Sequence, residues 1–305
     1  MIAMAIEQLI ESTGFCRCEE IENIYIMKAG MTNHSYSFYV NGEKYIVRIP
    51  GEGTEELINR YFEHDVYKAI DYLDISEDVI FFDPNTGVKI SVFLENAYSC
   101  NKEEFEDVQT CMKELRRFHN QHLTVAHKFD LWERIIHYEN LREGQPSCYN
   151  DYEDIKAAVS ELCTYVEEQP HEWTLCHIDS VPDNFLFQEY DGIKKVRLID
   201  WEYAGMQDPH LDIAMFAVYA MYDRPMVDRL IDAYFNEGCS DSVRLKIYCY
   251  IAISGLLWSN WCEYKKTKGV EFGSYAQKQY DYAKEYTAFF KSEMKKQAKS
   301  EKRCI

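Results

Sequence analysis

One eight-residue segment constrains the fold of this chain more than any other feature. It reads His177-Ile178-Asp179-Ser180-Val181-Pro182-Asp183-Asn184, in which a histidine, an aspartate and an asparagine have a defined spacing. Transfer of a phosphoryl group needs a carboxylate beside the attacking hydroxyl and further oxygen ligands for Mg²⁺. Asp179 suits the first role and Asn184 suits the second. The loop length sets the spacing of these two side chains, so that both can face one phosphate.

Apolar flanks place this segment between short strands. Residues 173–176 before it and 185–187 after it read as buried strands. Asp191-Gly192 is a hairpin signal, and a returning strand over residues 195–199 brings Asp200 back beside the loop. An isolated match to the motif is weak support, but these flanks strengthen it. Motif and context together predict a phosphotransferase site, with Asp200 as a second metal ligand.

Further segments of the chain share one family pattern. They are Leu198-Ile199-Asp200-Trp201-Glu202-Tyr203-Ala204-Gly205, Asp208-Pro209, Leu211-Asp212-Ile213-Ala214, Gly30-Met31-Thr32-Asn33 and Lys44-Tyr45-Ile46-Val47-Arg48-Ile49-Pro50-Gly51. With the motif, they resemble the choline kinase family, most closely its bacterial branch. The wider group of protein-kinase-like enzymes includes aminoglycoside phosphotransferases and ethanolamine kinases. The likeness covers nearly the whole chain. It is most specific over residues 176–214 and weaker over residues 101–169.

The resemblance implies a bilobal, protein-kinase-like α+β fold, with a small β-rich amino-terminal lobe and a larger, mainly helical carboxy-terminal lobe. It also implies an enzyme that uses ATP and Mg²⁺ to phosphorylate the hydroxyl of a small amino alcohol, most closely choline. Two supporting roles follow from the same likeness. His177, which we group with the catalytic residues, would brace the loop instead of transferring a proton. Asp212, in the first turn of a helix that begins near Pro209, would hold the loop through backbone amides.

The amino-terminal third reads as the β-rich lobe. Asn41-Gly42 is a strong hairpin signal, and a helix would begin at Thr54, as its cap, and run to Ile70. We therefore expect a nucleotide-binding lobe over residues 1–96 and a catalytic and substrate-binding lobe over residues 97–305. Apolar spacing predicts a further helix and five strands in the smaller lobe, over residues 2–12 and over residues 21–28, 36–40, 44–49, 79–82 and 88–93.

Within this lobe we expect two contacts to the nucleotide from loops. The turn from Gly30 to Asn33 can present backbone amides to phosphate. The adenine should lie near the lobe boundary, beside Phe93 and Glu95. No Walker-type G-x4-G-K-[ST] sequence is present, which sets the P-loop alternative aside.

Arg48 is the expected phosphate cation. It takes the strand position where protein kinases have a lysine, and its guanidinium can bind phosphate oxygens as a fork. Glu63, on the following helix, is the expected partner of Arg48, with Glu56 and Asp65 as competitors.

Aromatic residues of the carboxy-terminal half are the expected substrate contacts. A quaternary ammonium group cannot donate hydrogen bonds, so its recognition relies on aromatic faces and nearby negative charge. Trp258 and Trp261 lie three residues apart on one face of a helix expected over residues 243–264. Such a pair is more often core, but the resemblance favours an aromatic cage. The expected pocket residues are Trp258, Trp261, Tyr203, Tyr282 and Glu202, with Tyr219 as a further candidate.

Charge and cysteine content narrow the partners and the compartment. A formal net charge of −19 disfavours nucleic acid and is compatible with a cationic small molecule. Eleven cysteines, an odd number without regular spacing, favour a reducing cytoplasm over a disulfide framework. No apolar run approaches the roughly 20 residues of a membrane span, and the first residues lack the basic region of a signal peptide. We therefore expect a cytoplasmic protein without membrane insertion.

The remaining cysteine and histidine pairs do not form a convincing metal site. Cys16-x-Cys18 lacks a second ligand pair, and His119 and His122, on an expected helix, suit surface or packing positions. Three functions stay open beside choline kinase: an ethanolamine kinase, an aminoglycoside phosphotransferase and a noncatalytic choline-binding module. An aminoglycoside enzyme should line its pocket with carboxylates, and a noncatalytic module should have lost Asp179 or Asp200. The sequence does not determine the oligomeric state.

Overall fold

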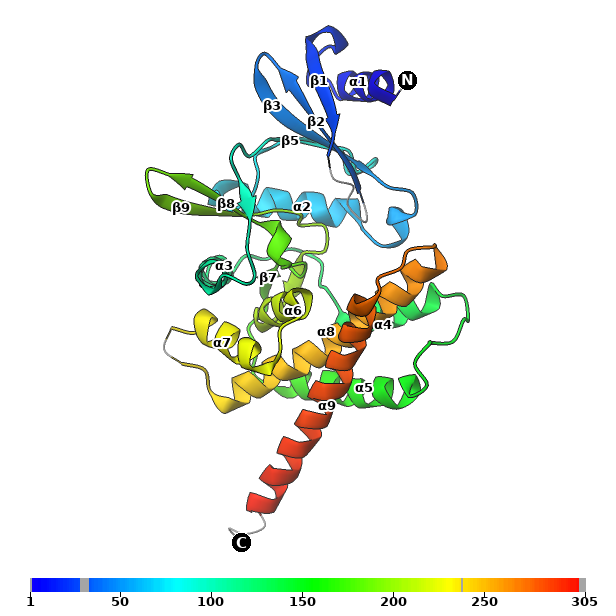
Figure 1. Ribbon diagram of the computed structural model, residues 1–305, viewed down its shortest axis with the longest axis vertical. Coiled ribbons are helices and arrows are strands. Elements are labelled where there is room, and N and C mark those ends of the chain that lie inside the picture. The colour runs from blue at the N-terminus through cyan, green and yellow to red at the C-terminus, as the bar shows by residue number, and fades with distance from the viewer. Residues whose placement is uncertain (1, 28–32, 237, 302–305) are drawn as a thin grey trace. The chain divides into compact units, whose positions relative to one another are not determined.

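The chain is built from a β-rich amino-terminal region and a mainly helical carboxy-terminal region, as the computed structural model shows for residues 2–27, 33–236 and 238–301 (Figure 1). This agrees with the expected α+β class. Two compact units make up the chain. Unit 1 contains Met1–Cys100 and Asp183–Ala204, and unit 2 contains Asn101–Pro182 and Gly205–Ile305. Packing thus groups the segment after the catalytic motif with the first hundred residues. The functional division into lobes at residue 96 stays a prediction.

Unit 1 contains an antiparallel five-stranded sheet. Asn41 and Gly42, both with positive φ, close the turn between β2 and β3, where Val40 pairs with Glu43. This confirms the predicted hairpin. The strands in spatial order are β1 Ile21–Ile26, β2 Asn33–Val40, β3 Glu43–Pro50, β5 Lys89–Val92 and β4 Val79–Phe82.

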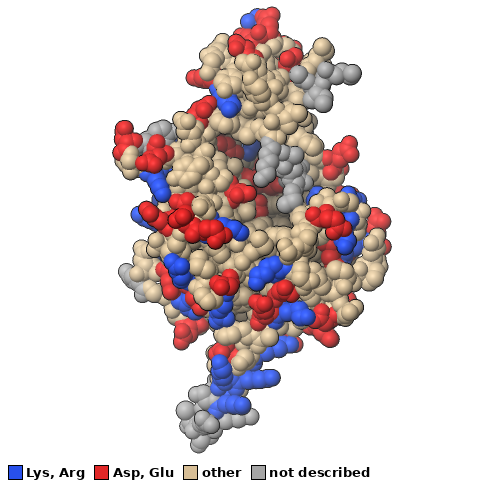
Figure 2. Space-filling view, in the orientation of Figure 1, with Lys and Arg blue, Asp and Glu red and all other residues tan. Residues whose placement is uncertain are grey.

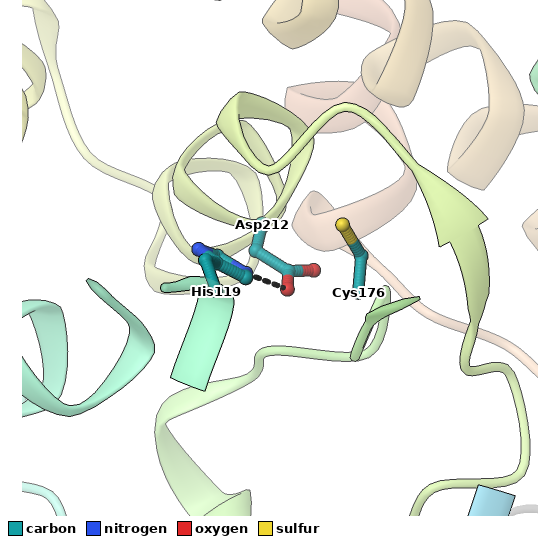
Figure 3. A group of neighbouring side chains, drawn as sticks. All are labelled: His119, Cys176 and Asp212. Atoms are coloured by element: carbon teal, nitrogen blue, oxygen red, sulfur yellow. Dashed lines mark hydrogen bonds and ion pairs between the residues drawn. The ribbon is translucent and has the colours of Figure 1, made fainter. Parts of the chain in front are cut away.

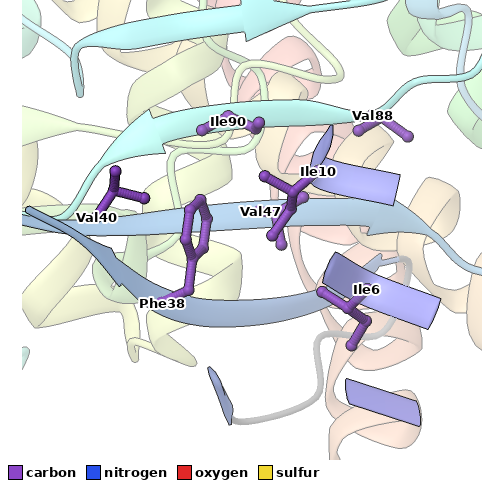
Figure 4. Packing of buried hydrophobic residues seen from close by; sticks show 7 residues of the cluster. All are labelled: Ile6, Ile10, Phe38, Val40, Val47, Val88 and Ile90. Carbon is purple, nitrogen blue, oxygen red and sulfur yellow. The ribbon is translucent and has the colours of Figure 1, made fainter. Parts of the chain in front are cut away.

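Helix α1, Ile2–Ser12, covers one face of this sheet. Ile6 and Ile10 point from α1 toward the strand residues Phe38 and Val47 (Figure 4). All four side chains are buried, so α1 and the sheet share one apolar core. The alternation of apolar residues along β2 and β3 supplies the strand side of this contact.

The second helix of unit 1 begins later than expected. Thr54–Glu56 form only a short 3₁₀ turn, and α2 runs from Arg60 to Ile70. The side-chain oxygen of Asn59 accepts hydrogen bonds from the backbone N–H groups of Tyr61 and Phe62, so Asn59 is the cap. The predicted start at Thr54 is wrong because two cap residues lie five positions apart and only the second caps the α-helix.

The segment after the catalytic motif forms a small sheet in unit 1. Strands β8, Phe185–Tyr190, and β9, Ile193–Leu198, are joined by Asp191 and Gly192, which both have positive φ. This is the predicted hairpin. A two-residue strand that the sequence did not signal, β6 at Tyr98–Ser99, pairs with β8.

Unit 2 is mainly helical, with one short antiparallel pair formed by β7, Thr174–Cys176, and β10, Gly205–Gln207. Helix α6 is almost entirely buried, and α8 and α9 pack closely against each other. At Gly255 of α8 a Cβ atom would lie 2.5 Å from the carbonyl oxygen of Gln279, so this approach requires glycine. The helices are α3 Phe105–His119, α4 Leu131–Asn140, α5 Tyr152–Glu168, α6 His210–Ala220, α7 Arg224–Tyr234, α8 Asp241–Thr267 and α9 Ser274–Glu301.

The last turns of α9 carry a group of lysines, Lys291, Lys295, Lys296 and Lys299 (Figure 2). Positive side chains near a helix carboxy terminus complement the helix dipole. Among the described residues, neither α8 nor α9 nor any shorter helix has the length and apolar content needed to cross a bilayer.

Candidate active site

The catalytic loop leaves β7 and ends in a 3₁₀ turn, Pro182–Asn184, that leads into β8. Two tight backbone hydrogen bonds shape it: Asp179 N–H donates to the His177 carbonyl (2.8 Å) and Val181 N–H donates to the Asp179 carbonyl (2.7 Å). Asp179 is only partly buried, whereas His177 is fully buried. The loop therefore exposes the candidate base and encloses the histidine, which suits the bracing role expected for His177.

Asp212 holds this loop from the first turn of α6. Its carboxylate oxygens accept hydrogen bonds from the backbone N–H groups of His177 (2.8 Å) and Ile178 (2.7 Å). Burial raises the pKa of Asp212, but contacts with His119 and His177 outweigh burial and lower it. Asp212 is thus an anion at neutral pH, and the expected support through backbone amides is confirmed.

A tyrosine of α6 contacts the candidate base directly. The hydroxyl of Tyr219 donates a hydrogen bond to the Asp179 carboxylate. The same ring packs against Trp258, with ring centroids 5.3 Å apart. Tyr219 therefore links Asp179 to the indole pair, and both ends of this link lie in unit 2.

The aromatic contacts continue from that indole. Trp258 and Trp261 meet edge to face at 6.0 Å, and Trp261 lies 5.1 Å from Phe272. Phe272 lies 6.3 Å from Tyr275. Burial raises the pKa of Tyr275 well above its usual value, and the Asp179 carboxylate adds to this effect. The chain of rings thus starts at the Tyr219 hydroxyl on Asp179 and continues through α8 to Tyr275 in α9. We call Tyr219, Trp258, Trp261, Phe272 and Tyr275 the aromatic cluster.

Three residues expected in the substrate pocket lie outside the aromatic cluster. Tyr282 is fully buried, and its hydroxyl donates to the Tyr222 carbonyl at 2.6 Å, so it packs α9 against its neighbours instead of joining the aromatic cluster. Tyr203 is buried in unit 1. Glu202 also belongs to unit 1, where its carboxylate lies 2.9 Å from the Arg60 guanidinium. This ion pair argues against Glu202 as the counter-charge of an ammonium group.

Unit 1 contains a buried network of charges. Arg48 forms a two-pronged ion pair with Glu63, and Arg60 lies 2.7 Å from the same carboxylate. Arg60 also donates to the side-chain oxygen of Asn33, and Asn33 donates to Glu202. The structure therefore selects Glu63 over Glu56 and Asp65 as the partner of Arg48. Their role toward ATP stays a prediction.

The electrostatics of this network favour the charged forms. Burial raises the pKa of Glu63, but Arg48, Lys89 and Arg60 outweigh it and lower the pKa to about 2. The sequence analysis did not predict that Arg60 belongs to this network. The only sequence feature that indicated it was the i, i+3 spacing between Arg60 and Glu63.

Asn184 and Asp200 come from neighbouring ends of the β8–β9 hairpin. Phe185 pairs with Leu198, and the Ile199 N–H donates to the Asn184 carbonyl at 3.0 Å. Asp200 has a φ of 67°, a left-handed conformation. Amide and carboxylate oxygens are the hard ligands that Mg²⁺ prefers, so these two residues fit this metal. Their metal role stays a prediction.

The expected adenine region is also in unit 1. Lys44 lies over the ring of Phe93, 3.7 Å from its centroid. The exposed Glu95 offers its carbonyl to Gln188 at 2.9 Å. Of the predicted phosphate turn, Gly30–Thr32 lie outside the described residues, and Asn33 belongs to the charge network.

His119, Cys176 and Asp212 lie close together in unit 2 (Figure 3). Metal binding by cysteine requires a thiolate. Burial raises the pKa of Cys176 well above its usual value, and its Sγ lies within hydrogen-bond distance of the Thr174 and Gln207 carbonyls. The group is therefore a poor metal site. His119 is buried, which agrees with the packing alternative. His122 lies beyond the end of α3 with positive φ, contrary to the expected helix.

Comparison with known proteins identifies the family. Residues 24–234 match the choline/ethanolamine kinase family, which is more than half of the chain. The chain belongs to this family. Protein LicA of Haemophilus influenzae is 30% identical over 271 residues, which cover 83% of this chain and 97% of LicA. The crystal structure of choline kinase LicA from Streptococcus pneumoniae is 27% identical, with a TM-score of 0.80 over 94% of this chain and 99% of that one.

A more distant likeness concerns the fold alone. An aminoglycoside phosphotransferase, solved as a thermostable mutant, is 16% identical, with a TM-score of 0.63 over 92% of this chain and 97% of that one. These findings confirm the kinase-like α+β fold. They also establish this choline/ethanolamine kinase family member as a nucleotide-binding phosphotransferase with an alcohol group as acceptor.

The two units divide the candidate residues by role. Residues expected to bind nucleotide and metal all fall in unit 1: Asn33, Arg48, Glu63, Phe93, Glu95, Asn184 and Asp200. Unit 2 contributes Asp179, its support from Asp212 and the aromatic cluster. The chain crosses from unit 2 to unit 1 between Pro182 and Asp183, inside the motif.

Arg48 offers the first prediction. Arg48→Ala should raise the KM for ATP roughly ten- to 150-fold, because a charge-assisted hydrogen bond contributes about 1.5–3 kcal/mol and 1.36 kcal/mol is tenfold. Arg48→Lys should restore part of this loss, since the charge returns without the fork. Acceptor preference should not change, because the acceptor residues lie in unit 2. Steady-state kinetics with varied ATP measures this.

Arg197→Lys is the matched control, because Arg197 is another buried arginine of unit 1 and contacts Asp74 and the Ser76 carbonyl instead of Glu63. It should leave the KM for ATP unchanged. A shift in acceptor preference with an unaltered KM for ATP in the Arg48 variants would remove Arg48 from the nucleotide site.

Proposed function

We propose that this enzyme transfers the γ-phosphoryl group of ATP to the hydroxyl of choline, forming phosphocholine. The observation that carries this proposal is the aromatic cluster beside Asp179, linked to it by the Tyr219 hydroxyl. An acceptor held by these rings would have a cationic end against aromatic faces and a hydroxyl toward a carboxylate. Choline has this combination of groups.

The chemistry of the cluster suits a trimethylammonium group. Such a cation is recognised by the faces of aromatic rings, at about 0.5–2 kcal/mol per ring, because it has no N–H to donate. Trp258 and Trp261 are 3% and 6% exposed, so a cation bound against them would be largely desolvated. The likeness to choline kinase LicA of Streptococcus pneumoniae supports the same acceptor.

Two rivals have less support. Ethanolamine carries a primary ammonium that needs hydrogen-bond acceptors, and Glu202, the carboxylate among the expected pocket residues, is paired with Arg60. An aminoglycoside carries several ammonium and hydroxyl groups and suits a pocket lined with carboxylates. The cluster beside Asp179 is aromatic instead. A noncatalytic module is disfavoured because Asp179, Asn184 and Asp200 are all present.

The proposed reaction assigns each residue a task. Asp179 accepts a hydrogen bond from the choline hydroxyl and takes up its proton as the oxygen attacks phosphorus, while Asp212 keeps the loop in place. Arg48 binds phosphate oxygens of the donor. Mg²⁺ held by Asn184 and Asp200 would neutralise charge on the phosphates. A cytoplasmic location, expected from the cysteine content, belongs to the same proposal.

The indoles allow a test of acceptor recognition. Trp261→Leu should reduce kcat/KM for choline by roughly two- to thirtyfold, given cation–π attraction of about 0.5–2 kcal/mol and 1.36 kcal/mol per tenfold. The loss should appear mainly in KM, because the ammonium is bound alike in the ground and transition states. Ethanolamine should lose less, since water can still solvate its N–H groups. Steady-state kinetics with both alcohols measures this.

Phe118→Leu is the control for a packing defect, because Phe118 is an equally buried ring of unit 2 in α3 and lies outside the aromatic cluster. It should lower the unfolding temperature without changing the ratio of choline to ethanolamine activity. If Trp261→Leu behaves in the same way as this control, Trp261 is a core residue and the cage is refuted.

The acceptor itself is tested by a panel. ADP release should be measured with choline, ethanolamine, related amino alcohols and several aminoglycosides at matched concentrations. The proposal expects choline to have the highest kcat/KM. A higher value for ethanolamine would replace the substrate but keep the reaction, whereas a preference for aminoglycosides would overturn the proposed function.

A further inference from the structure

The residue before the candidate base has an unfavourable backbone conformation. Ile178 has a φ of 69°, in the left-handed region. For a β-branched residue this conformation is a genuine outlier, and it persists only where the surroundings hold it. Its side chain is fully buried. The direction in which Asp179 leaves the loop therefore depends on the groups that hold Ile178.

Asp212 supplies the direct restraint on this strained residue. Its Oδ1 accepts from Ile178 N–H and its Oδ2 accepts from His177 N–H. On the other side of the loop, the Ser180 hydroxyl donates to the backbone carbonyl of Asp212 at 2.7 Å. A carboxylate can provide these bonds only while its plane is fixed, so the side chains that orient Asp212 matter to the loop.

His119 and Tyr234 orient that carboxylate. His119 Nε2 lies 2.9 Å from Asp212 Oδ2, and His119 Nδ1 lies 2.8 Å from the Tyr234 hydroxyl. Because a carboxylate only accepts, Nε2 carries the proton, and in the neutral ring Nδ1 accepts from the Tyr234 hydroxyl. Burial raises the pKa of Tyr234, which keeps its hydroxyl protonated and able to donate. The bonds therefore run in one direction, from Tyr234 through His119 to Asp212.

We propose that His119 and Tyr234 are positioning residues for phosphoryl transfer. Through Asp212 they hold Ile178 in its strained conformation and so fix the Asp179 carboxylate. Their hydrogen bonds lead to Asp212, and their effect on Asp179 passes through the loop backbone. This inference rests on the proposed function, because turnover reports the position of the base. A displacement of about 1 Å at a reacting group can cost about 10²-fold in rate.

Three variants test this hydrogen-bond relay, which runs from Tyr234 through His119 to Asp212. His119→Leu removes both ring nitrogens and should lower kcat with choline by roughly ten- to a hundredfold. His119→Gln keeps an N–H donor near the position of Nε2 and should recover part of that loss. Tyr234→Phe removes one hydroxyl and should lower kcat about two- to tenfold, the scale of one neutral hydrogen bond. The KM values for ATP and choline should stay nearly unchanged in all three.

Hydrogen exchange provides a readout that needs no turnover. In His119→Leu the peptide spanning residues 176–182 should exchange its amides faster than in the wild type, while peptides from α8 should not change. Tyr248→Phe is the matched control, because it removes a hydroxyl bonded to Asp228 on a tyrosine that is also largely buried in unit 2. It should leave both kcat and the exchange of the loop peptide unchanged.

The outcomes separate this inference from the proposed function. Unchanged kcat and unchanged loop exchange in folded His119→Gln and Tyr234→Phe would overturn the relay, even if His119→Leu fails to fold. An equal loss of kcat in the Tyr248→Phe control would show that the variants act by general destabilisation. That result would also overturn the relay. Faster loop exchange in a protein whose wild type phosphorylates no amino alcohol would support the relay and refute only the proposed function.

Discussion

Asp179→Asn should cut kcat by a factor on the order of 10² to 10⁴ while leaving nucleotide binding nearly intact, the usual scale for a group that handles a proton in the transition state. The amide keeps the shape of the carboxylate and can still accept the hydrogen bond from Tyr219, so the loop should remain folded. It cannot take up the proton of the attacking hydroxyl. Single-turnover kinetics together with titration of ATP separates these two effects.

Asp183→Asn is the matched control for this change. Asp183 lies four residues further along the same motif and is exposed. Neutralising it alters the charge of the loop without touching the proposed base, so kcat should stay close to the wild-type value. Near-normal turnover of choline by Asp179→Asn would show that the base is another group.

Asp200→Asn should raise the Mg²⁺ concentration needed for half-maximal activity and lower kcat roughly 10²-fold or more, the scale observed when one electrostatic stabiliser is lost. Asparagine is preferable to alanine here because Asp200 has a left-handed backbone, which asparagine tolerates. The variant thus removes charge without adding strain. Initial rates over a range of Mg²⁺ concentrations measure both effects.

Asp191→Asn is the corresponding control, because Asp191 is another left-handed aspartate of unit 1 and lies in the exposed β8–β9 turn. Its Mg²⁺ dependence should match that of the wild type. If Asp200→Asn shows the same Mg²⁺ dependence as the wild type, Asp200 is not a metal ligand.

Local patterns made the catalytic segment predictable. The motif, its flanking strands and the Asp191-Gly192 turn are encoded within about thirty consecutive residues, and turn chemistry fixes the hairpin register. The partner of Arg48 could also be predicted, since one helix face offers few acidic residues. The role of His119 could not be predicted, because its partners Asp212 and Tyr234 are about a hundred residues away along the chain and no periodicity indicates that contact.

The position of Tyr282 outside the aromatic cluster has a geometric reason. Tyr275 and Tyr282 are seven residues apart, which is two helical turns, so both lie on the same face of α9. The seven-residue spacing alone does not predict which of the two tyrosines contacts Phe272. The start of α2 failed in a similar way, because Thr54 and Asn59 are both acceptable caps.

We expect Asp179 to control the transfer of the phosphoryl group from ATP to the choline hydroxyl. Mass spectrometry of the product after incubation with MgATP and choline tests this most directly, with Asp179→Asn as the comparison. We expect phosphocholine in amounts equal to the ADP formed, and little of either from the variant. Formation of ADP and inorganic phosphate with choline unmodified, or equal phosphocholine from both proteins, would contradict it.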